Sequence, residues 1–398
     1  MALDLDWVGA AQANTSAIER RAASLGARRS VKKDYQAAWL LRAITCIDLT
    51  TLSGDDTKAR VKRLCDKARR PLRDDLLKAL DIASLQTGAI CVYHDMVETA
   101  VSALEGSGIP VAAVSTGFPA GLSPLELRIA EIKASVAAGA REIDIVISRR
   151  HVLTQNWQAL YDEMQAFRAA CGEAHVKAIL ATGELGSLRN VARASLICMM
   201  GGADFIKTST GKESVNATLP VSLVMVRAIR DYHDRTGYAV GYKPAGGISK
   251  AKDALVYLSM IKEELGDQWL RADLFRFGAS SLLGDIERYT MSMYDTYGDG
   301  WNGATVDLYY NGVYGQTFGT AFTTGDSLIV DFDVCTGTEI AVVNGAQGSY
   351  PSEVYYTLSN ASGTQNVSVS SGNFNVGAVD TVMSNCVTPS CPTPSNLG

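Results

Sequence analysis

Two lysines, Lys207 and Lys243, have the sequence surroundings of catalytic amines. Each ends a short apolar run that is typical of a buried strand, and small, glycine-rich residues follow each one, within 203–212 and 240–247. If the two ammonium groups converge on one pocket they repel, and one of them can lose its proton and act as a nucleophile. The pattern therefore indicates an enzyme that forms a Schiff base with a carbonyl substrate.

A catalytic lysine must have a lowered pKa. An unperturbed lysine titrates near pH ~10.4, and each unit of pKa corresponds to about 1.36 kcal/mol, so a neutral amine at physiological pH requires burial and a neighbouring charge together. The alternative is that Lys207 and Lys243 extend from strand ends to water. Either lysine alone would fit that alternative equally well, whereas the pair favours the catalytic interpretation.

These lysines lie in a region where short β-like runs alternate with helical patterns. Such alternation predicts a parallel sheet, and eight units favour a closed (β/α)8 TIM barrel over an open doubly wound sheet. The GxGxxG motif that a dinucleotide-binding open sheet would carry after its first strand is absent. An amphipathic helical extension, 1–42, precedes the barrel, which we place at 43–290. The predicted strands are 43–49, 89–93, 111–115, 142–147, 176–182, 203–208, 239–243 and 274–278, and the predicted helices include 124–138, 157–171, 188–200, 220–236 and 250–265.

In a TIM barrel the chemistry lies at the carboxyl ends of the strands. Asp48, Asp144 and Lys177 fall on the predicted strands together with the two lysines. Charges in apolar strands are costly unless they are paired. Asp144 could be one partner of a purely structural salt bridge, but the lysines outnumber what structure alone needs.

Glycine clusters follow the last three predicted strands and predict a phosphate subsite. Each cluster precedes a helical pattern, so backbone amides and helix N-termini can cradle an anion there. Three clusters on adjacent strands are stronger evidence than one Gly-Gly pair. The clusters are Gly211-Lys212, Gly246-Gly247 and Gly278-Ala279-Ser280-Ser281.

A change of composition divides the 398 residues near position 290. Residues 291–398 contain no Lys, Arg or His but nine Asp and Glu, so the first 290 residues hold all 37 Lys and Arg against 33 acidic residues. The near-neutral first part has no basic stripe for nucleic acid. We expect no membrane span, because no apolar run approaches about 18 residues. The N-terminus lacks signal-peptide features and the first part's cysteines lack metal-binding spacing, so we expect a cytoplasmic protein.

The second region, 294–388, alternates apolar and polar residues between Gly and Asn turns. Asn311-Gly312 between two such runs is a strong hairpin signal, and the whole predicts a β-sandwich or jelly roll of about eight short strands. Asp295, Asp299 and Asn302 offer oxygen ligands for Ca²⁺ in a glycine-rich loop, although Asx-turns without a metal would also explain them. Cys335, Cys386 and Cys391 allow one disulfide, and 389–398 is a Pro/Ser-rich tail.

Long motifs in the first region resemble deoxyribose-phosphate aldolase. The segments are 48–52 (DLTTL), 142–146 (EIDIV), 205–212 (FIKTSTGK), 243–247 (KPAGG) and 277–281 (FGASS). The resemblance runs from residue 5 to 290 and is closest to the longer forms with an N-terminal helical extension. Residues 294–303 resemble the opening of a module of secreted and surface proteins.

The resemblance implies a class I aldolase that needs no cofactor. It would cleave 2-deoxy-D-ribose 5-phosphate, reversibly, to acetaldehyde and D-glyceraldehyde 3-phosphate. Lys207 matches the Schiff-base lysine, Lys243 the second lysine that lowers its pKa, and Asp144 the carboxylate of the proton relay. Asp48 and Thr50 match positions near the substrate hydroxyls, and Lys177 lines the same pocket. The phosphate-binding set comprises Lys212, Gly211, Gly246, Gly247, Gly278, Ser280 and Ser281.

One departure from the family pattern concerns the phosphate subsite. The family usually carries an arginine after Gly-Gly-Ile, and here Ser249 and then Lys250 follow. Losing a bidentate donor should weaken phosphate binding by about 1.5–3 kcal/mol unless Lys250 replaces it.

Two alternatives to the main interpretation remain. An inert or retuned barrel could carry a surface- or carbohydrate-binding β module, although an inert barrel has no physical reason to keep Lys207, Lys243 and Asp144. The second alternative is an aldolase that acts on a different substrate, and Ser249 in place of the family's arginine favours it. The expected partner is a small sugar phosphate, and the family's barrels often pair, so a homo-oligomer is possible.

Overall fold

The computed structural model describes residues 1–28, 33–72, 77–78, 81–286, 289–310, 312–332, 339–360 and 365–383. The predicted tail 389–398 and the cysteines at 335, 386 and 391 lie outside these residues. The chain divides into two compact units, Met1–Leu283 and Gly284–Gly398. Each is described below by itself.

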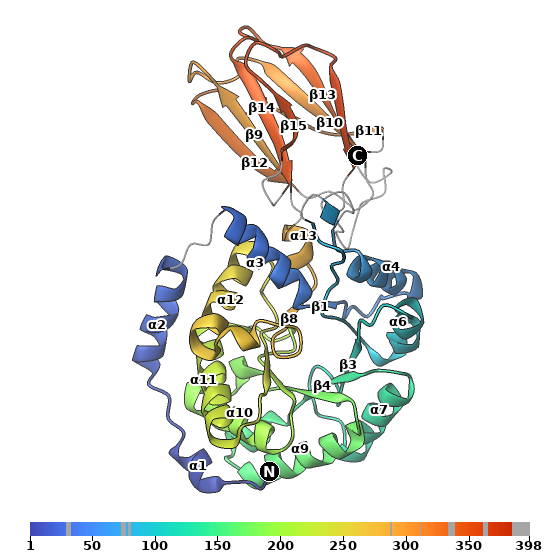
Figure 1. The fold of residues 1–398 in the computed structure, drawn as a ribbon, viewed down its shortest axis with the longest axis vertical. Coiled ribbons are helices and arrows are strands. Elements are labelled where there is room, and N and C mark those ends of the chain that lie inside the picture. Colours follow the sequence, from blue (N-terminus) through green and yellow to red (C-terminus); the bar gives the residue numbers. More distant parts are fainter. Residues whose placement is uncertain are drawn as a thin grey trace. The chain divides into compact units, whose positions relative to one another are not determined.

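The first unit is built on an eight-stranded parallel sheet in the order β7-β6-β5-β4-β3-β2-β1-β8 (Figure 1). Parallel bridges between Tyr242 and Phe275 and between Ala245 and Gly278 join the two ends of this order, so the sheet closes. The (β/α)8 barrel predicted from the sequence is therefore confirmed. The strands are β1 Ile47–Thr50, β2 Ala89–Val92, β3 Val111–Ser115, β4 Glu142–Val146, β5 His175–Ile179, β6 Phe205–Lys207, β7 Gly241–Lys243 and β8 Phe277–Ala279.

Helices cover the outside of the barrel because each strand must return over the sheet to pair in parallel with the next. Side-chain caps begin several of them: Thr218 accepts from the amide of Val221 ahead of α11, and Ser187 accepts from the amide of Asn190 ahead of α10. The helices are α4 Lys58–Arg69, α6 Val97–Ala103, α7 Leu125–Ala137, α8 Arg149–Leu153, α9 Trp157–Cys171, α10 Leu188–Met200, α11 Leu219–Thr236, α12 Ala251–Leu265 and α13 Leu282–Ile286, with short 3-10 turns η1 His94–Met96, η2 Thr182–Glu184 and η3 Asp267–Trp269.

The predicted N-terminal extension forms three helices, α1 Leu5–Ala10, α2 Thr15–Arg28 and α3 Lys33–Thr45. The second packs against α11 and the third against α12. The prediction of a strand from residue 43 was wrong by a few residues, because Ala43 and Ile44 belong to the buried face of α3 and the strand begins at Ile47. A short apolar run does not distinguish a buried helix end from a strand.

The second unit contains two four-stranded antiparallel sheets, in the orders β11-β10-β13-β16 and β12-β9-β14-β15. Tyr310 pairs with Val313 across the predicted hairpin. Its first strand begins at Tyr289, earlier than expected, because Met291 and Met293 alternate inward and belong to the buried core. The strands are β9 Tyr289–Asp295, β10 Ala304–Tyr310, β11 Val313–Phe318, β12 Ser327–Phe332, β13 Glu339–Gln347, β14 Val354–Asn360, β15 Gln365–Val369 and β16 Val379–Met383.

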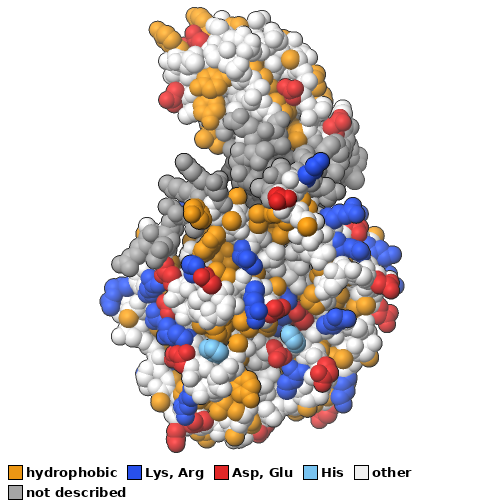
Figure 2. Space-filling view, viewed as in Figure 1, with side chains coloured by type: hydrophobic (Ala, Val, Ile, Leu, Met, Phe, Trp, Pro, Cys, Tyr) orange, Lys and Arg blue, Asp and Glu red, His pale blue; other side chains and the backbone are white. Residues whose placement is uncertain are grey.

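Charged side chains of both signs are interspersed over the surface of the barrel unit (Figure 2). This agrees with its near-neutral composition and shows no single-sign field on the face in view. Of the helices in the described part of the chain, none combines the length and the apolar character that crossing a membrane requires.

Candidate active site

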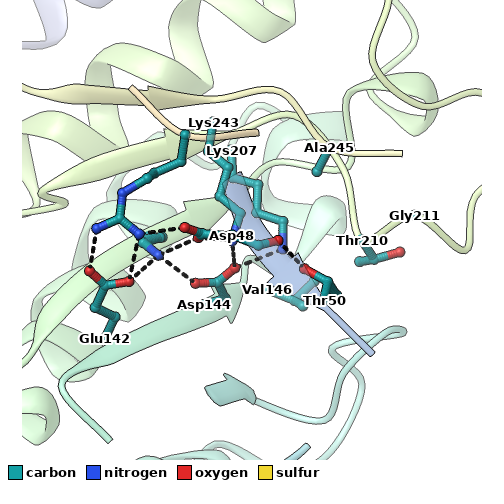
Figure 3. Close-up of polar contacts among 12 residues, drawn as sticks. Asp48, Thr50, Glu142, Asp144, Val146, Lys207, Thr210, Gly211, Lys243 and Ala245 are labelled. Carbon is teal, nitrogen blue, oxygen red and sulfur yellow. Dashed lines mark hydrogen bonds and ion pairs between the residues drawn. The ribbon is translucent and has the colours of Figure 1, made fainter. Parts of the chain in front are cut away.

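Lys207 is the last residue of β6, and its amine is buried inside the barrel. The side chain is only 3% exposed, and Nζ donates a hydrogen bond to Oδ2 of Asp144 at 2.7 Å (Figure 3). Burial lowers the pKa of the Lys207 amine below its ordinary value of 10.5, and the cation of Lys243 lowers it further, against the opposing charge of Asp144. The neutral amine is therefore more accessible here than for a lysine in water.

Lys243, the last residue of β7, lies beside it with the opposite tendency. Its Nζ donates to Oδ2 of Asp144 at 2.8 Å and to Oδ2 of Asp48 at 2.5 Å, in a side chain that is fully buried. Burial alone would lower the pKa of Lys243, but the two carboxylates outweigh burial and raise the pKa above its ordinary value. Lys243 is therefore held as an ammonium ion next to the amine of Lys207.

Asp144, in the middle of β4, connects the two lysines. Burial favours its neutral form, but the charges of Lys207, Lys243 and Lys177 outweigh burial and hold the pKa of the carboxyl below its ordinary value of 3.8. Oδ2 accepts from Lys207 and from Lys243, whereas the buried Oδ1 has no hydrogen-bond partner among the described residues, with Nζ of Lys177 3.7 Å away. Oδ1 is thus an ionised oxygen with free acceptor capacity.

A second group of charges is linked to Lys243 through Asp48. Lys177 on β5 donates to Asp48 at 2.7 Å and to Glu142, and Arg276, just before β8, donates to Asp48 and, at 2.9 Å, to Glu142. Both oxygens of Asp48 are therefore engaged by basic groups, and Lys177 is fully buried. These contacts make Asp48 and Lys177 supports for the lysine pair rather than free substrate ligands.

Glu142 and Arg276 are members of this charged cluster that we did not predict. Glu142 lies two residues before Asp144 on β4, and residues two apart in a strand share a face. This spacing alone could have placed Glu142 inside the barrel. Arg276 carries no comparable signal, because it precedes its strand and reaches Asp48 and Glu142 only once the barrel is closed.

The charge balance of this buried cluster favours a neutral Lys207. If every group is ionised, four cations face three carboxylates, whereas a neutral Lys207 leaves three of each sign. An uncompensated buried charge is costly, so the balanced state is favoured on electrostatic grounds. The ion pairs join Lys177, Lys207, Lys243 and Arg276 to Asp48, Glu142 and Asp144.

The predicted glycine clusters lie at the same carboxyl-terminal edge. A Cβ on Gly211 would be 3.9 Å from Cα of Gly246, so the loops after β6 and β7 are neighbours. Gly246 and Gly247 both have positive φ, +81° and +82°. A Cβ on Gly278 would be 2.7 Å from Cβ of Ala245 and 3.1 Å from Cε of Lys243, so a larger residue here would clash with Ala245 and crowd Lys243.

The remaining predicted ligands lie near this edge, but some of them already make hydrogen bonds within the chain. Thr50 is half-buried and donates from Oγ1 to its own strand, at the carbonyl of Asp48, 2.7 Å away. Lys212, Gly247, Ser280 and Ser281 are exposed. The Gly211 amide donates to Oε2 of Glu213 at 3.2 Å.

Glu213, which we did not predict, occupies the amide cradle after β6. Its carboxylate accepts from the amide of Thr210 at 3.0 Å and from the Thr210 hydroxyl at 2.8 Å, in addition to Gly211. The backbone amides of this turn are thus directed at a negative charge supplied by the chain itself. An anionic ligand that used the Gly211 amide would have to displace or share that carboxylate.

The barrel region is similar in sequence to known aldolases. The family model for DeoC/LacD family aldolases matches residues 42–286. Over 290 residues the chain is 62% identical to the deoxyribose-phosphate aldolase of Bos taurus, 63% to that of Mus musculus and 60% to that of Homo sapiens; each match covers 72% of this chain and 91% of the relative.

The solved structures agree at the level of the fold. A crystal structure of a protein assigned as a deoxyribose-phosphate aldolase from Toxoplasma gondii has a TM-score of 0.55 at 22% identity, covering 64% of this chain and 94% of that one. One from Coccidioides immitis has a TM-score of 0.50 at 22% identity, covering 68% and 96%. Both matches reach nearly the full length of the other protein.

Proposed function

The chain belongs to the DeoC/LacD family of aldolases, and on that basis we propose that it is a deoxyribose-phosphate aldolase. The reaction would be the reversible cleavage of 2-deoxy-D-ribose 5-phosphate to acetaldehyde and D-glyceraldehyde 3-phosphate. The observation that carries this proposal is the buried amine of Lys207, whose pKa is lowered by burial and which shares one carboxylate oxygen with the ammonium of Lys243. Relatives named for this activity, at 60–63% identity, support the choice of substrate.

The first step joins substrate and enzyme. The neutral amine of Lys207 attacks C1 of the open-chain aldehyde and gives a carbinolamine. Loss of water from it, assisted by a proton from Lys243, gives a protonated imine. Lys243 suits this role because its two carboxylate neighbours keep it protonated.

The second step breaks the C2–C3 bond. Asp144, through a bridging water, takes the proton of the C3 hydroxyl, and Oδ1 is the oxygen with free acceptor capacity for that water. The electron pair of the broken bond moves into the imine and forms an enamine, while C3 becomes the aldehyde of D-glyceraldehyde 3-phosphate. Protonation of the enamine at C2 and hydrolysis of the imine then release acetaldehyde and restore Lys207.

The phosphate would bind at the glycine loops that follow β6, β7 and β8. Backbone amides near Gly211, Gly246 and Gly247 and the exposed Lys212 would supply donors and positive charge. Ser280 and Ser281 would complete the subsite from the loop after β8. Asp48 and Lys177 would support the lysine pair through the contacts described above, and Thr50 would lie near the substrate hydroxyls.

The proposal is tested by measuring both products from 2-deoxyribose 5-phosphate with the full-length protein. Lys207→Met should reduce product release to background, because no other described lysine has the same burial and partners. Lys252→Met, at an exposed position of α12, is the matched control and should retain wild-type turnover. Folded wild-type protein that releases neither product, or a Lys207→Met variant that remains active, would refute the proposal.

A further inference from the structure

Three carboxylates converge at one end of the β12-β9-β14-β15 sheet. Asp295 ends β9, Asp299 lies in the loop that follows, and Glu353 lies in the turn before β14; one oxygen from each lies within 4.8 Å of the other two. The sequence predicted Asp295 and Asp299 but not Glu353. Asn302, the third residue of the predicted set, instead donates Nδ2 to Oδ1 of Asp299 at 2.9 Å and so supports that carboxylate.

Backbone contacts fix the segments that carry these groups. Val354 pairs with Asp295 across β14 and β9, and the amide of Thr296 donates to the carbonyl of Glu353 at 3.3 Å. A parallel bridge between Asp299 and Gly325 anchors the loop. The sheet register therefore holds the segments that carry the three carboxylates close together.

A buried, unsatisfied oxygen points independently to a ligand. Asp295 is only 3% exposed. Its Oδ1 accepts a hydrogen bond from the amide of Tyr297 at 2.9 Å, whereas the buried Oδ2 has no hydrogen-bond partner in the described part of the chain. Buried carboxylate oxygens without a partner are costly and rare in native structures. A bound cation would satisfy this oxygen.

The surrounding sequence offers no positive side chain to do so. Residues 291–398 contain no Lys, Arg or His, while Asp295, Asp299 and Glu353 bring three negative charges together. Like charges at this separation repel one another. Because residues 291–398 supply no basic side chain, a cation from solvent would offset this repulsion.

We propose that Asp295, Asp299 and Glu353 bind one Ca²⁺ ion. Ca²⁺ takes oxygen ligands at about 2.3–2.6 Å, so oxygens on opposite sides of the ion can be about 4.6–5.2 Å apart, which accommodates the observed spread. Mg²⁺ demands an octahedron with oxygens at about 2.0–2.1 Å and keeps most of its waters, so it suits a cluster of this width less well. Water would complete the Ca²⁺ shell.

Such an ion would join the loop after β9 to the turn before β14. Because it binds only the folded unit, its affinity adds directly to stability: Ca²⁺ at about 100 times its Kd raises the folded-to-unfolded ratio about 100-fold. The site is independent of the aldolase chemistry. Its failure would leave the proposed function of the barrel untouched.

The test uses the full chain, stripped with a chelator and then desalted. Titration calorimetry with CaCl₂ should give one site per chain, and the thermal midpoint of the β-rich unit should rise with Ca²⁺ while that of the barrel does not. MgCl₂ at equal concentration should bind at least tenfold more weakly. No heat and no Ca²⁺-dependent midpoint, or equal binding of Mg²⁺, would overturn the assignment to Ca²⁺.

Substitutions of the proposed ligands test where the Ca²⁺ ion binds. Asp295→Asn should abolish binding, and Glu353→Gln, in a partly exposed turn whose change leaves the sheet core intact, should weaken it at least tenfold. Asp380→Asn is the control, since this exposed carboxylate lies on β16 of the other sheet. If Asp295→Asn fails to fold, Glu353→Gln alone decides. Unchanged Ca²⁺ binding in Glu353→Gln, or equal loss in Asp380→Asn, would contradict the proposal.

Discussion

Lys207 and Lys243 donate hydrogen bonds to the same oxygen, Oδ2 of Asp144, at 2.7 and 2.8 Å. The two lysines that share this acceptor are not equivalent. Lys243 has a second carboxylate, Asp48, whereas Asp144 is the one carboxylate that Lys207 contacts among the described residues. The pKa of Lys243 is therefore raised and that of Lys207 is lowered, with burial the largest effect on Lys207. In the proposed mechanism, Lys207 is therefore the nucleophile and Lys243 the proton donor.

Removing Lys243 should move the pH dependence of catalysis. In the proposed mechanism only the neutral amine of Lys207 attacks, so kcat/KM should rise with pH as Lys207 deprotonates, below its ordinary pKa of 10.5. In Lys243→Gln the neighbouring cation is lost and Asp144 remains, so the pKa of Lys207 should rise and the ascending limb should move to higher pH. We also expect a fall in kcat/KM of about 10²–10⁴-fold, the usual contribution of a proton-transfer group.

The pH profile of kcat/KM for the wild type, Lys243→Gln and Lys252→Gln checks this. Lys252 is exposed on α12 and its variant should reproduce the wild-type profile. A Lys243→Gln profile that falls in height without moving along the pH axis would show that Lys243 does not tune Lys207.

Arg276 should be a large contributor to the stability of the barrel. It is 4% exposed and contacts both Asp48 and Glu142, so Arg276→Ala would leave two buried carboxylates with one fewer cation. Removing one partner of a buried pair costs about 3–5 kcal/mol. The loss should be measured by urea unfolding, with Arg271→Ala as the control. The nearest acid to Arg271, Asp273, is 3.9 Å away on the surface, and such exposed pairs contribute about 0–1 kcal/mol. Equal losses in both variants would refute a special role for Arg276.

The same cluster should make the barrel sensitive to acid. Burial opposes ionisation of Asp144, yet its lysine neighbours hold the folded pKa below 3.8, so the unfolded chain binds more protons as the pH falls past that value. This contribution to the free energy of unfolding is complete above pH 3.8 and is lost as the pH drops toward the folded pKa. Urea unfolding across this pH range should show a steeper loss for wild type than for Asp144→Asn; parallel curves would contradict the mechanism.

The phosphate subsite should improve when the arginine of the family pattern is restored. Ser249 is exposed directly after Ile248, next to the glycines of the β7 loop. In Ser249→Arg a planar donor should strengthen phosphate binding by about 1.5–3 kcal/mol, which lowers KM roughly tenfold or more with kcat little changed. Steady-state kinetics with 2-deoxyribose 5-phosphate test this, and KM for unphosphorylated 2-deoxyribose should not change. An unaltered KM for the phosphorylated sugar would contradict it.

The parts of the site that the sequence predicts are those that depend on one strand at a time. Lys207, Lys243 and Asp144 stand out because each is a charged residue on an apolar strand, and strand–helix alternation predicts the barrel that gathers such residues at one edge. Arg276 depends instead on the pairing of β8 with β1, two strands at opposite ends of the barrel sequence, which no local pattern records.

Other details escaped because local patterns are ambiguous or because the contacts are long-range. The apolar residues Ala43 and Ile44 continue a helix, although they equally fit a strand. Glu213 folds back on the amides of its own turn, a choice that depends on loop geometry. Glu353 meets Asp295 through the pairing of β14 with β9, strands that are remote in the sequence.

Reductive trapping of the enzyme–substrate adduct tests the central claim most directly. The full chain is incubated with 2-deoxyribose 5-phosphate and sodium borohydride, digested, and its peptides are mapped by mass, with Lys207→Arg and a sample without sugar phosphate as controls. The account predicts one reduced adduct, on the peptide that contains Lys207, and none in either control. An adduct on Lys243 or another lysine, or none from folded wild-type protein, would contradict it.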